Sequence, residues 1–509
     1  CIVARRTVRY RPHHHLILPI DMSALCVGKE CQPTTTCSTA ELCVPDEVPS
    51  CPGDVCLLPD DGRVAGASGA AGDGGMSGGV AGAAGGAGAA GGGAGAPMRP
   101  PLPPVLTALG DGHSCAWVPG SRAQGSRAQC WGYNVSGQLG RGTVSDLGFP
   151  DPAFVLDAGG PLTGVRAMSL NDGYSCAIVD PAGKVVCWGE NNEGQLGNDT
   201  DLPKAPKPSP RARPVHRDVA GTPLAGARQI ATGDDASCAL LDADGSVLCW
   251  GDNSRGQLGD NGRVSVYSPF AVSVRDENDQ PLVGASELAV GGGSGCALFQ
   301  PEGTVRCWGN NEYGEQGLGP GASTGPNRLA RPVLDESLAP LKGVRQISLG
   351  GSHVCALMEA DGSVRCWGRN DVGQVGDGTT TDQPLPRPVQ ADAAGTPLTG
   401  AYQLVLGGLY SCALFDGGAV RCWGSNAKGE MGNATLPSTP NRYPANVRQG
   451  ADPLQGVGQM TAGFSHACAS FADGTLGCWG SNELGELARG SATELPLLFD
   501  KVVGLKPWN

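Results

Sequence analysis

The sequence lacks the features that mark several common functional classes. It has no uninterrupted run of about 18 apolar residues, the length that a membrane-crossing helix needs, so no transmembrane segment is predicted. Lys and Arg number 36 against 49 Asp and Glu, a net charge of −13, and no basic patch stands out. Because a phosphate-binding surface needs clustered positive charge, we do not expect nucleic acid as a partner. Charged residues are only 17 % of the chain and are scattered, so no acidic tail is indicated.

Motifs for catalysis and for metal binding are also missing. The chain has no G-x-S-x-G, no H-E-x-x-H, no phosphate-binding loop and no EF-hand loop. It has no C-x-x-C pair and no Cys/His cluster with zinc-finger spacing. We therefore predict a protein without enzymatic activity, cofactor or metal site. Consecutive His13, His14 and His15 would point to opposite faces of a strand, which favours a polar strand over a metal site.

Cysteine, in contrast, is abundant, with 21 residues. Cytosolic proteins rarely carry so many without metal-binding spacing, so the count favours disulfides in an oxidising, extracytoplasmic compartment over buried free thiols. The expected location is a cell surface, the outside of an outer membrane, or the medium. The chain begins with Cys1, which we interpret as the edge of a fragment, with a processed or lipid-bearing terminus as the alternative.

Composition divides the chain into four segments. Residues 1–25 contain short strand-like runs and are expected to be the end of a truncated domain. Residues 61–103 are rich in Gly, Ala and Pro and are predicted to be a disordered linker. Residues 104–509 are repetitive. Between them, residues 26–60 are predicted to form a small module held by three disulfides of undetermined pairing among Cys26, Cys31, Cys37, Cys43, Cys51 and Cys56.

Seven copies of one pattern occupy the repetitive segment. Each has a first cysteine, a glycine-containing turn, a second cysteine followed by Trp-Gly, and a polar glycine-rich tail, as in CALLDADGSVLCWGDNSRGQLG. The second cysteines recur every 56 to 62 residues, a period that suits a four-stranded propeller blade. An alternating strand precedes each first cysteine, and a further strand such as ARPVHRDV (212–219) follows the tail, which gives four strands per copy.

The two cysteines of each copy are placed symmetrically about the turn. Folding the fifth copy between residues 360 and 361 brings Cys355 opposite Cys366 and Leu357 opposite Val364. Opposed residues in antiparallel strands have Cα atoms about 4.5–5.5 Å apart, within or close to disulfide range. Zinc is a poor alternative, because two thiolates leave two ligand positions empty. The predicted disulfides are Cys115–Cys130, Cys176–Cys187, Cys238–Cys249, Cys296–Cys307, Cys355–Cys366, Cys412–Cys422 and Cys468–Cys478.

The pattern G-x-x-H-S-C-A-L … D-G-x-V-x-C-W-G-x-N-x-x-G-Q-L-G resembles the regulator of chromosome condensation repeat over about 400 residues. The resemblance implies an all-β fold, a seven-bladed β-propeller of four-stranded antiparallel blades. The cysteine-rich form resembles that of bacterial surface or secreted proteins, in which a Gly/Ala tether often precedes the propeller. We expect the tail, 494–505, to return to the first blade and close a monomeric ring.

Three positions recur in all copies and are interpreted as structural. The tryptophans are expected to pack between blades rather than to stack on sugars: Trp131, Trp188, Trp250, Trp308, Trp367, Trp423 and Trp479. An Asn followed three residues later by Gly, as in Asn134 and Gly137, is expected to form a turn. The position two residues before the first cysteine is interpreted as a polar turn residue rather than a metal ligand or base: His113, Tyr174, Ala236, Ser294, His353, Tyr410 and His466.

Function is therefore predicted from the scaffold and its loops. We predict an exported cell-surface or secreted binding propeller that recognises a protein or glycan through variable loops, such as 198–214 and 319–332. The alternative is a regulator of a small GTPase that acts as a guanine-nucleotide exchange factor, the family's best-known activity. That activity implies a reducing compartment and an exchange wedge, and no comparable insertion stands out in the third copy. A secreted bacterial β-lactamase inhibitor shares the fold and acts only by binding, so fold does not fix function.

Overall fold

The computed structural model describes residues 105–118, 126–198, 207–264, 266–435, 441–490 and 498–505, and the backbone of 35–37 and 43–45. The chain divides into two units, 1–65 and 66–509. In the first unit, β1 (Thr35–Cys37) pairs with β2 (Cys43–Pro45) in an antiparallel ladder. The three histidines near the N-terminus, the pairing of the six cysteines in 26–60 and the linker 61–103 lie outside the described residues, so these interpretations stay predictions.

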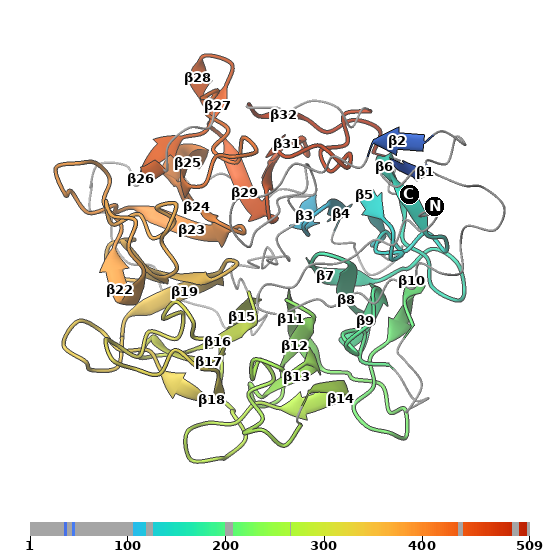
Figure 1. Ribbon diagram of the computed structural model, residues 1–509, viewed down its shortest axis with the longest axis horizontal. Coiled ribbons are helices and arrows are strands. Elements are labelled where there is room, and N and C mark those ends of the chain that lie inside the picture. The colour runs from blue at the N-terminus through green and yellow to red at the C-terminus, as the bar shows by residue number, and fades with distance from the viewer. Residues whose placement is uncertain are drawn as a thin grey trace, which may run out of the picture. The chain divides into compact units, whose positions relative to one another are not determined.

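The second unit contains seven four-stranded antiparallel sheets, one for each sequence repeat, arranged as blades around a centre (Figure 1). This confirms the predicted seven-bladed β-propeller. Each sheet takes its four strands from consecutive sequence, and the first strand of each blade lies innermost (Figure 1). Apart from a 3-10 turn at Asp416–Gly418, the described residues form no helix, so none of them forms an apolar helix of membrane-spanning length.

The strands are as follows. Blade 1 contains β3 (Leu106–Leu109), β4 (His113–Trp117), β5 (Ala128–Asn134) and β6 (Ser145–Phe154). Blade 2 contains β7 (Val165–Leu170), β8 (Tyr174–Val179), β9 (Lys184–Gly189) and β10 (Ser209–Pro214). Blade 3 contains β11 (Ala227–Gly233), β12 (Ala236–Leu241), β13 (Val247–Asp252) and β14 (Tyr267–Ser273). Blade 4 contains β15 (Glu287–Gly291), β16 (Ser294–Phe299), β17 (Thr304–Gly309) and β18 (Asn327–Pro332).

The remaining blades follow the same order. Blade 5 contains β19 (Val344–Leu349), β20 (His353–Met358), β21 (Val364–Gly368) and β22 (Gln383–Pro388). Blade 6 contains β23 (Ala401–Leu406), β24 (Tyr410–Phe415), β25 (Ala419–Gly424) and β26 (Asn441–Asn446). Blade 7 contains β29 (Val457–Ala462), β30 (His466–Phe471), β31 (Leu476–Gly480) and β32 (Asp500–Lys501). A short hairpin, β27 (Arg448–Gln449) with β28 (Asp452–Pro453), stands between blades 6 and 7 in the chain.

The hairpin of the second and third strands has the predicted register. In blade 5, Cys355 pairs with Cys366 and Leu357 with Val364. The glycine after each tryptophan then interrupts the ladder: Gly368 has φ +96°, and a Cβ there would lie 2.6 Å from the carbonyl oxygen of Ser352. Because only glycine takes this conformation at no steric cost, the Trp-Gly pair marks the bulge beside the outer strand.

The outer strands begin earlier than predicted. The sequence suggested 212–219 in blade 2, but β10 ends at Pro214. Beyond it the fully buried Val215 fills the core, and its carbonyl oxygen accepts a hydrogen bond of 2.8 Å from the N–H of Leu224. The alternation that we interpreted as one strand therefore spans the end of a strand and the start of a turn.

The C-terminal segment pairs with a different blade from the one predicted. In β32, Asp500 lies opposite Cys478 and Lys501 opposite Gly477, so the tail supplies the fourth strand of blade 7. Blade 1 already has its own fourth strand, β6, so the tail is not needed to complete that blade. Contact with blade 1 is instead made by side chains, because Val502 and Leu505 pack on a cluster that includes residues of blades 1 and 7.

Candidate binding sites on the propeller

Each blade hairpin carries one disulfide, and each disulfide is covered by the next blade. The structure joins the seven cysteine pairs expected from the sequence, with Cα atoms 4.0 to 4.1 Å apart. Trp423 of blade 6, for example, belongs to the same apolar cluster as Cys355 and Cys366 of blade 5. The same relation holds at the ring closure, where Trp131 of blade 1 packs with Cys468 and Cys478 of blade 7.

The seven tryptophans are fully buried and hydrogen-bonded, so none is free to stack on a ligand. Every indole N–H donates to a backbone carbonyl of the preceding blade, at 2.7 to 2.9 Å. The bonds are Trp131 to Glu486, Trp188 to Gln138, Trp250 to Gln195, Trp308 to Gln257, Trp367 to Glu315, Trp423 to Gln374 and Trp479 to Glu430.

The recurring asparagines serve the turns that follow the third strands. In all seven copies the side-chain oxygen accepts the backbone N–H five residues later, at 3.0 to 3.1 Å, as Asn134 does from Leu139. The glycine three residues after each asparagine has a positive φ, +82° at Gly137. The side chains are thus committed to local backbone and are not a ligand ring.

The prediction that the residues two before the first cysteines lie in turns is wrong for the three histidines. Each of them begins the second strand of its blade. His113, His353 and His466 are at most 1 % exposed, and each Nε2 lies 2.8 to 2.9 Å from a serine hydroxyl of the next blade. Burial lowers the pKa of each to about 3, and for His113 the charge of His466 adds to this. Neutral imidazoles therefore join blades 1 to 2, 5 to 6 and 7 to 1.

At the position four residues after the recurring asparagine, three blades have a buried glutamate and the other four have glutamine. Glu486 in blade 7 accepts hydrogen bonds from the Leu484 N–H and the Ser481 hydroxyl, each 2.7 Å. Burial raises the pKa of Glu486 and of Glu315 to about 7 and also raises that of Glu430. All three side chains point into inter-strand turns, so they are structural groups with altered acidity.

Carboxamide clamps, which we did not predict from the sequence, join the innermost strands of blades 3 and 4, 5 and 6, and 6 and 7. Gln346 of β19 accepts the N–H of Leu404 at 2.9 Å and donates to its carbonyl at 3.1 Å. Gln403 makes the same pair of bonds with Met460, and Gln229 with Leu288. The signal is visible in the repeated runs GVRQISL, GAYQLVL and GARQIAT, which place glutamine at one strand position.

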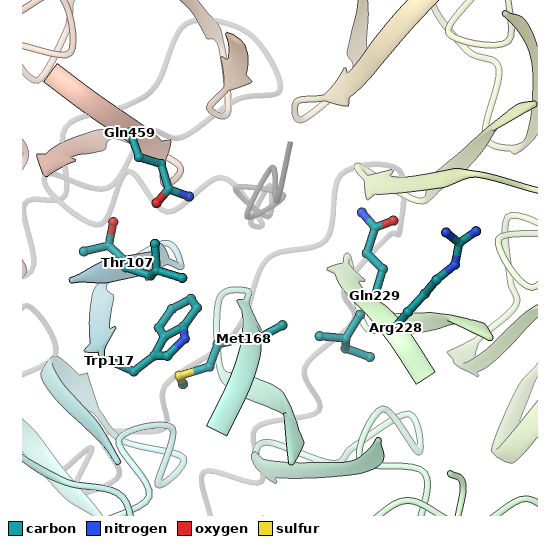
Figure 2. A pocket seen from close by; sticks show the side chains of 9 residues that line it. Thr107, Trp117, Met168, Arg228, Gln229 and Gln459 are labelled. Atoms are coloured by element: carbon teal, nitrogen blue, oxygen red, sulfur yellow. The ribbon is translucent and has the colours of Figure 1, made fainter. Parts of the chain in front are cut away.

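Blades 1 and 2 have no glutamine at the clamp position, and a cavity lies beside them. Leu106 and Ala167 occupy the clamp position in blades 1 and 2, and neither can form such a pair. The cavity has a volume of about 20 Å³ and is lined by residues of the inner strands of blades 7, 1, 2 and 3, together with Trp117 of β4. Figure 2 shows Gln459 and Thr107 on one side of this space, Gln229 on the other, and Met168 beside Trp117.

A larger cavity lies at the rim of blade 4, in one of the two loops predicted to recognise a partner. Its volume is about 480 Å³, and Leu318, Pro326, Pro332, Leu334 and Pro340 supply most of its apolar lining. Arg331 of β18 is exposed at the same cavity and forms no ion pair with any residue that the structure describes. Such a volume is within the range of ligand pockets.

The other predicted recognition loop offers less. Residues 199–206 lie outside the described part, and residues 209–214 form β10, in which Arg211 donates to the carbonyl of Asp157 at 2.9 Å. Within the described ranges no three or more His, Cys, Asp or Glu side chains are grouped so that they could hold a metal ion. The two cavities are therefore the sites that deserve a functional test.

Comparison with known proteins identifies the family to which the propeller is similar. Residues 127–506 match the family model described as RCC1-like domain. The ultraviolet-B receptor UVR8 of Arabidopsis thaliana is 24 % identical over 330 residues, which cover 64 % of this chain and 68 % of the receptor. The E3 ubiquitin-protein ligase HERC2 of Homo sapiens is 29 % identical over 344 residues, which are 66 % of this chain but only 6 % of the ligase.

Solved structures agree on the fold. Yeast RCC1 (Prp20), in a crystal structure bound to Kap60, superposes with a TM-score of 0.55 at 18 % identity, covering 80 % of this chain and 85 % of that one. A separate structure of Prp20p from Saccharomyces cerevisiae, reported with its binding properties to Gsp1p and histones, has the same TM-score. The family match spans most of the chain and includes all seven second cysteines. The chain therefore belongs to the RCC1-like domain family.

Proposed function

We propose that the protein is an exported binding propeller, secreted or held at a cell surface, which recognises a protein or glycan through its rim and performs no catalysis. The relatives support a binding or regulatory role, since Prp20p binds Gsp1p and histones. The ligase activity in the name of HERC2 does not transfer to this chain, because the similarity covers only 6 % of that protein. Seven disulfides, one per blade, support an oxidising compartment.

The observation that carries the proposal is the rim cavity of blade 4. Its proline-rich and aliphatic lining suits an apolar group, and the guanidinium of Arg331, which forms no ion pair with a described residue, suits a carboxylate or another acceptor beside it. The corresponding residue of blade 5 is Arg387. Its guanidinium nitrogen lies 3.7 Å from a carboxylate oxygen of Glu336, so Arg387 already has an ion-pair partner. The loop 319–332 therefore differs from its counterpart in both shape and charge.

The alternative is a guanine-nucleotide exchange factor-like regulator of a small GTPase. The binding of Prp20p to Gsp1p is the finding that favours it. It requires the protein to work in a reducing compartment, where cross-strand disulfides do not persist. The state of the cysteines in the native protein therefore separates the two functions.

The rim cavity is tested with the full chain, immobilised and screened against a glycan array and a random-peptide display library. We expect retained ligands whose binding is lost in Ala322→Trp, which fills the cavity, and weakened in Arg331→Ala. Arg387→Ala is the matched control, because it removes an equivalent arginine from blade 5. Failure of both screens, or equal loss in the Arg331 and Arg387 variants, would contradict the proposal.

A further inference from the structure

The rim cavity of blade 4 lies between two loops that the propeller holds in place. Leu334 donates its N–H to the carbonyl of Gly317 at 2.9 Å and pairs with Pro340 in a single antiparallel β-bridge. Gly319 donates its N–H to the carbonyl of Pro384 in blade 5 at 3.1 Å. Because these bonds tie both loops to blade 4 or to its neighbour, the cavity is preformed, as most ligand pockets are.

Leu318 departs from the repeat in a way that opens this cavity. The equivalent residues of the other six blades are polar: Arg141, Asn198, Asp260, Asp377, Asn433 and Arg489. In blades 3 and 5 this side chain closes the loop from within. Asp260 accepts the N–H of Gly262 at 3.0 Å, and Asp377 accepts the N–H of Thr379 at 2.9 Å. Leu318 cannot accept a hydrogen bond, and its half-buried side chain lines the cavity instead.

The polar groups of the lining favour an anion. None of the ten lining residues is acidic, and three are prolines, which have no N–H to donate. The side-chain N–H of Asn327 donates to Oε1 of Gln316 at 2.7 Å, and the hydroxyl oxygen of Ser323 accepts the N–H of Gly325 at 3.1 Å. Arg331 is exposed and forms no ion pair with any residue in the described ranges. Its guanidinium is therefore the charged donor that the cavity offers.

We propose that this cavity binds the free C-terminus of a partner polypeptide whose last residue is aliphatic. The inference rests on the proposed function, because it names the group that the binding propeller recognises. The terminal side chain lies against Leu318 and Leu334, and the terminal carboxylate accepts hydrogen bonds from Arg331. Capture of a terminal carboxylate is a recurring mode of peptide recognition.

The shape and chemistry of the lining separate this ligand from others. A terminal leucine or valine carries its carboxylate and its branched side chain on one carbon atom, so both fit beside each other, whereas a neutral glycan has neither group. The volume of about 480 Å³ is within the range of about 300–1,000 Å³ that ligand pockets have. Ser323 and Asn327 also line the cavity, which suits the polar backbone of a peptide better than the unbroken alkyl chain of a fatty acid.

The test is fluorescence anisotropy of the full chain with three labelled hexapeptides and with octanoate as a competitor. The first peptide ends in Ala-Leu with a free carboxylate, the second is its C-terminal amide, and the third ends in Ala-Ser with a free carboxylate. We expect the first to bind at least tenfold more tightly than the other two and to resist displacement by octanoate. Equal affinity of the acid and the amide, or of the Leu and Ser peptides, would overturn the proposal. Displacement by octanoate as efficient as by the unlabelled peptide would also overturn it.

The outcome also separates this inference from the proposed function. A glycan, or a peptide that binds equally well with its C-terminus blocked, would overturn C-terminal recognition alone if its binding is lost in Ala322→Trp. The rim of blade 4 would then remain the binding surface.

Variants assign the charged contact. Arg331→Ala should weaken binding of the acid peptide on the order of tenfold to a hundredfold and change that of the amide little. Leu318→Asp, which copies Asp377 of blade 5, places a negative charge beside the carboxylate and should also weaken the acid more than the amide. Arg387→Ala is the matched control and should leave binding unchanged. Equal loss for acid and amide in Arg331→Ala, with a thermal melt showing a folded chain, would overturn the assignment.

Discussion

The junctions that follow blades 5 and 6 differ from the junctions on either side of blade 1. Blade 5 holds blade 6 through the indole of Trp423, the imidazole of His353 and both bonds of the Gln346 clamp. Blade 6 holds blade 7 in a similar way, with two bonds from the hydroxyl of Tyr410. Each of these contacts crosses from one blade to the next, so the ring is strongly joined there.

Among the described residues, neither junction of blade 1 has a paired carboxamide clamp. The junction with blade 7 has the Trp131 indole, the His466 imidazole and a 2.7 Å bond between the hydroxyls of Thr107 and Thr461. No described strand crosses this junction, because each blade is made of its own repeat. The comparison teaches that the ring closes without a paired carboxamide clamp, and that the small cavity beside blade 1 lies where this clamp is missing.

The largest expected effect is that of removing the closing tryptophan. Trp131→Ala leaves a large cavity and removes one of the two hydrogen bonds to the Glu486 carbonyl, the other coming from the Ser114 hydroxyl; it should lower the free energy of unfolding by about 3–5 kcal/mol. Trp423→Ala is the matched variant at a junction that keeps its glutamine clamp. Calorimetric melts should show the lower transition temperature for the Trp131 variant. Equal or reversed transition temperatures would contradict the difference between the junctions.

The second prediction concerns the pH dependence at Glu486, whose backbone carbonyl receives the Trp131 bond. Because its folded-state pKa is raised to about 7 from 4.5, its stabilising contribution is complete below pH 4.5 and is lost as pH rises through 7. Glu486→Gln, which copies Gln138 of blade 1, should match the natural protein near pH 4.5 and exceed its stability at pH 8, by at most about 3 kcal/mol.

Chemical denaturation at a series of pH values measures this difference. Ser481→Ala is a useful companion, because it removes the donor of a 2.7 Å bond to the same carboxylate and should leave a pH-dependent stability. A Glu486→Gln variant whose advantage does not grow between pH 4.5 and pH 8 would show that the carboxylate is ionised throughout that range.

The third and smallest effect separates the two kinds of glutamine. Gln403→Leu leaves the buried N–H and carbonyl of Met460 without their side-chain partners and should cost about 1–2 kcal/mol. Gln459→Leu breaks no bond at Oε1 and should change stability by only a few tenths. Urea denaturation of the two variants side by side makes the measurement. A large loss in the Gln459 variant would mean that blade 7 clamps blade 1 after all.

The repeat made most of the blade predictable. Opposed cysteines such as Cys355 and Cys366 follow from the symmetry of a hairpin about its turn, because register in a short antiparallel pair is fixed by loop length. Asn134 and Gly137 were interpretable from local turn chemistry alone. These inferences need only neighbours in sequence.

Contacts between blades were not predictable in the same way. The roles of His113 and Gln346 depend on which residue of the next repeat lies beside them, and a periodic sequence does not show the offset between adjacent sheets. The tail was assigned to the wrong blade for a related reason, since an extended segment with the strand pattern pairs equally well with any free edge. The small cavity beside blade 1 arises where repeats depart from their consensus, at Leu106, Ala167 and Trp117.

The most direct test of the whole account is disulfide mapping of the native protein. Free thiols are alkylated without reduction, the chain is digested, and cross-linked peptides are identified by mass spectrometry. The account predicts one cross-link within each hairpin, such as Cys238 with Cys249, and no alkylated cysteine among the fourteen of the propeller. Alkylated propeller cysteines, or cross-links between different blades, would contradict both the hairpin geometry and the proposed export.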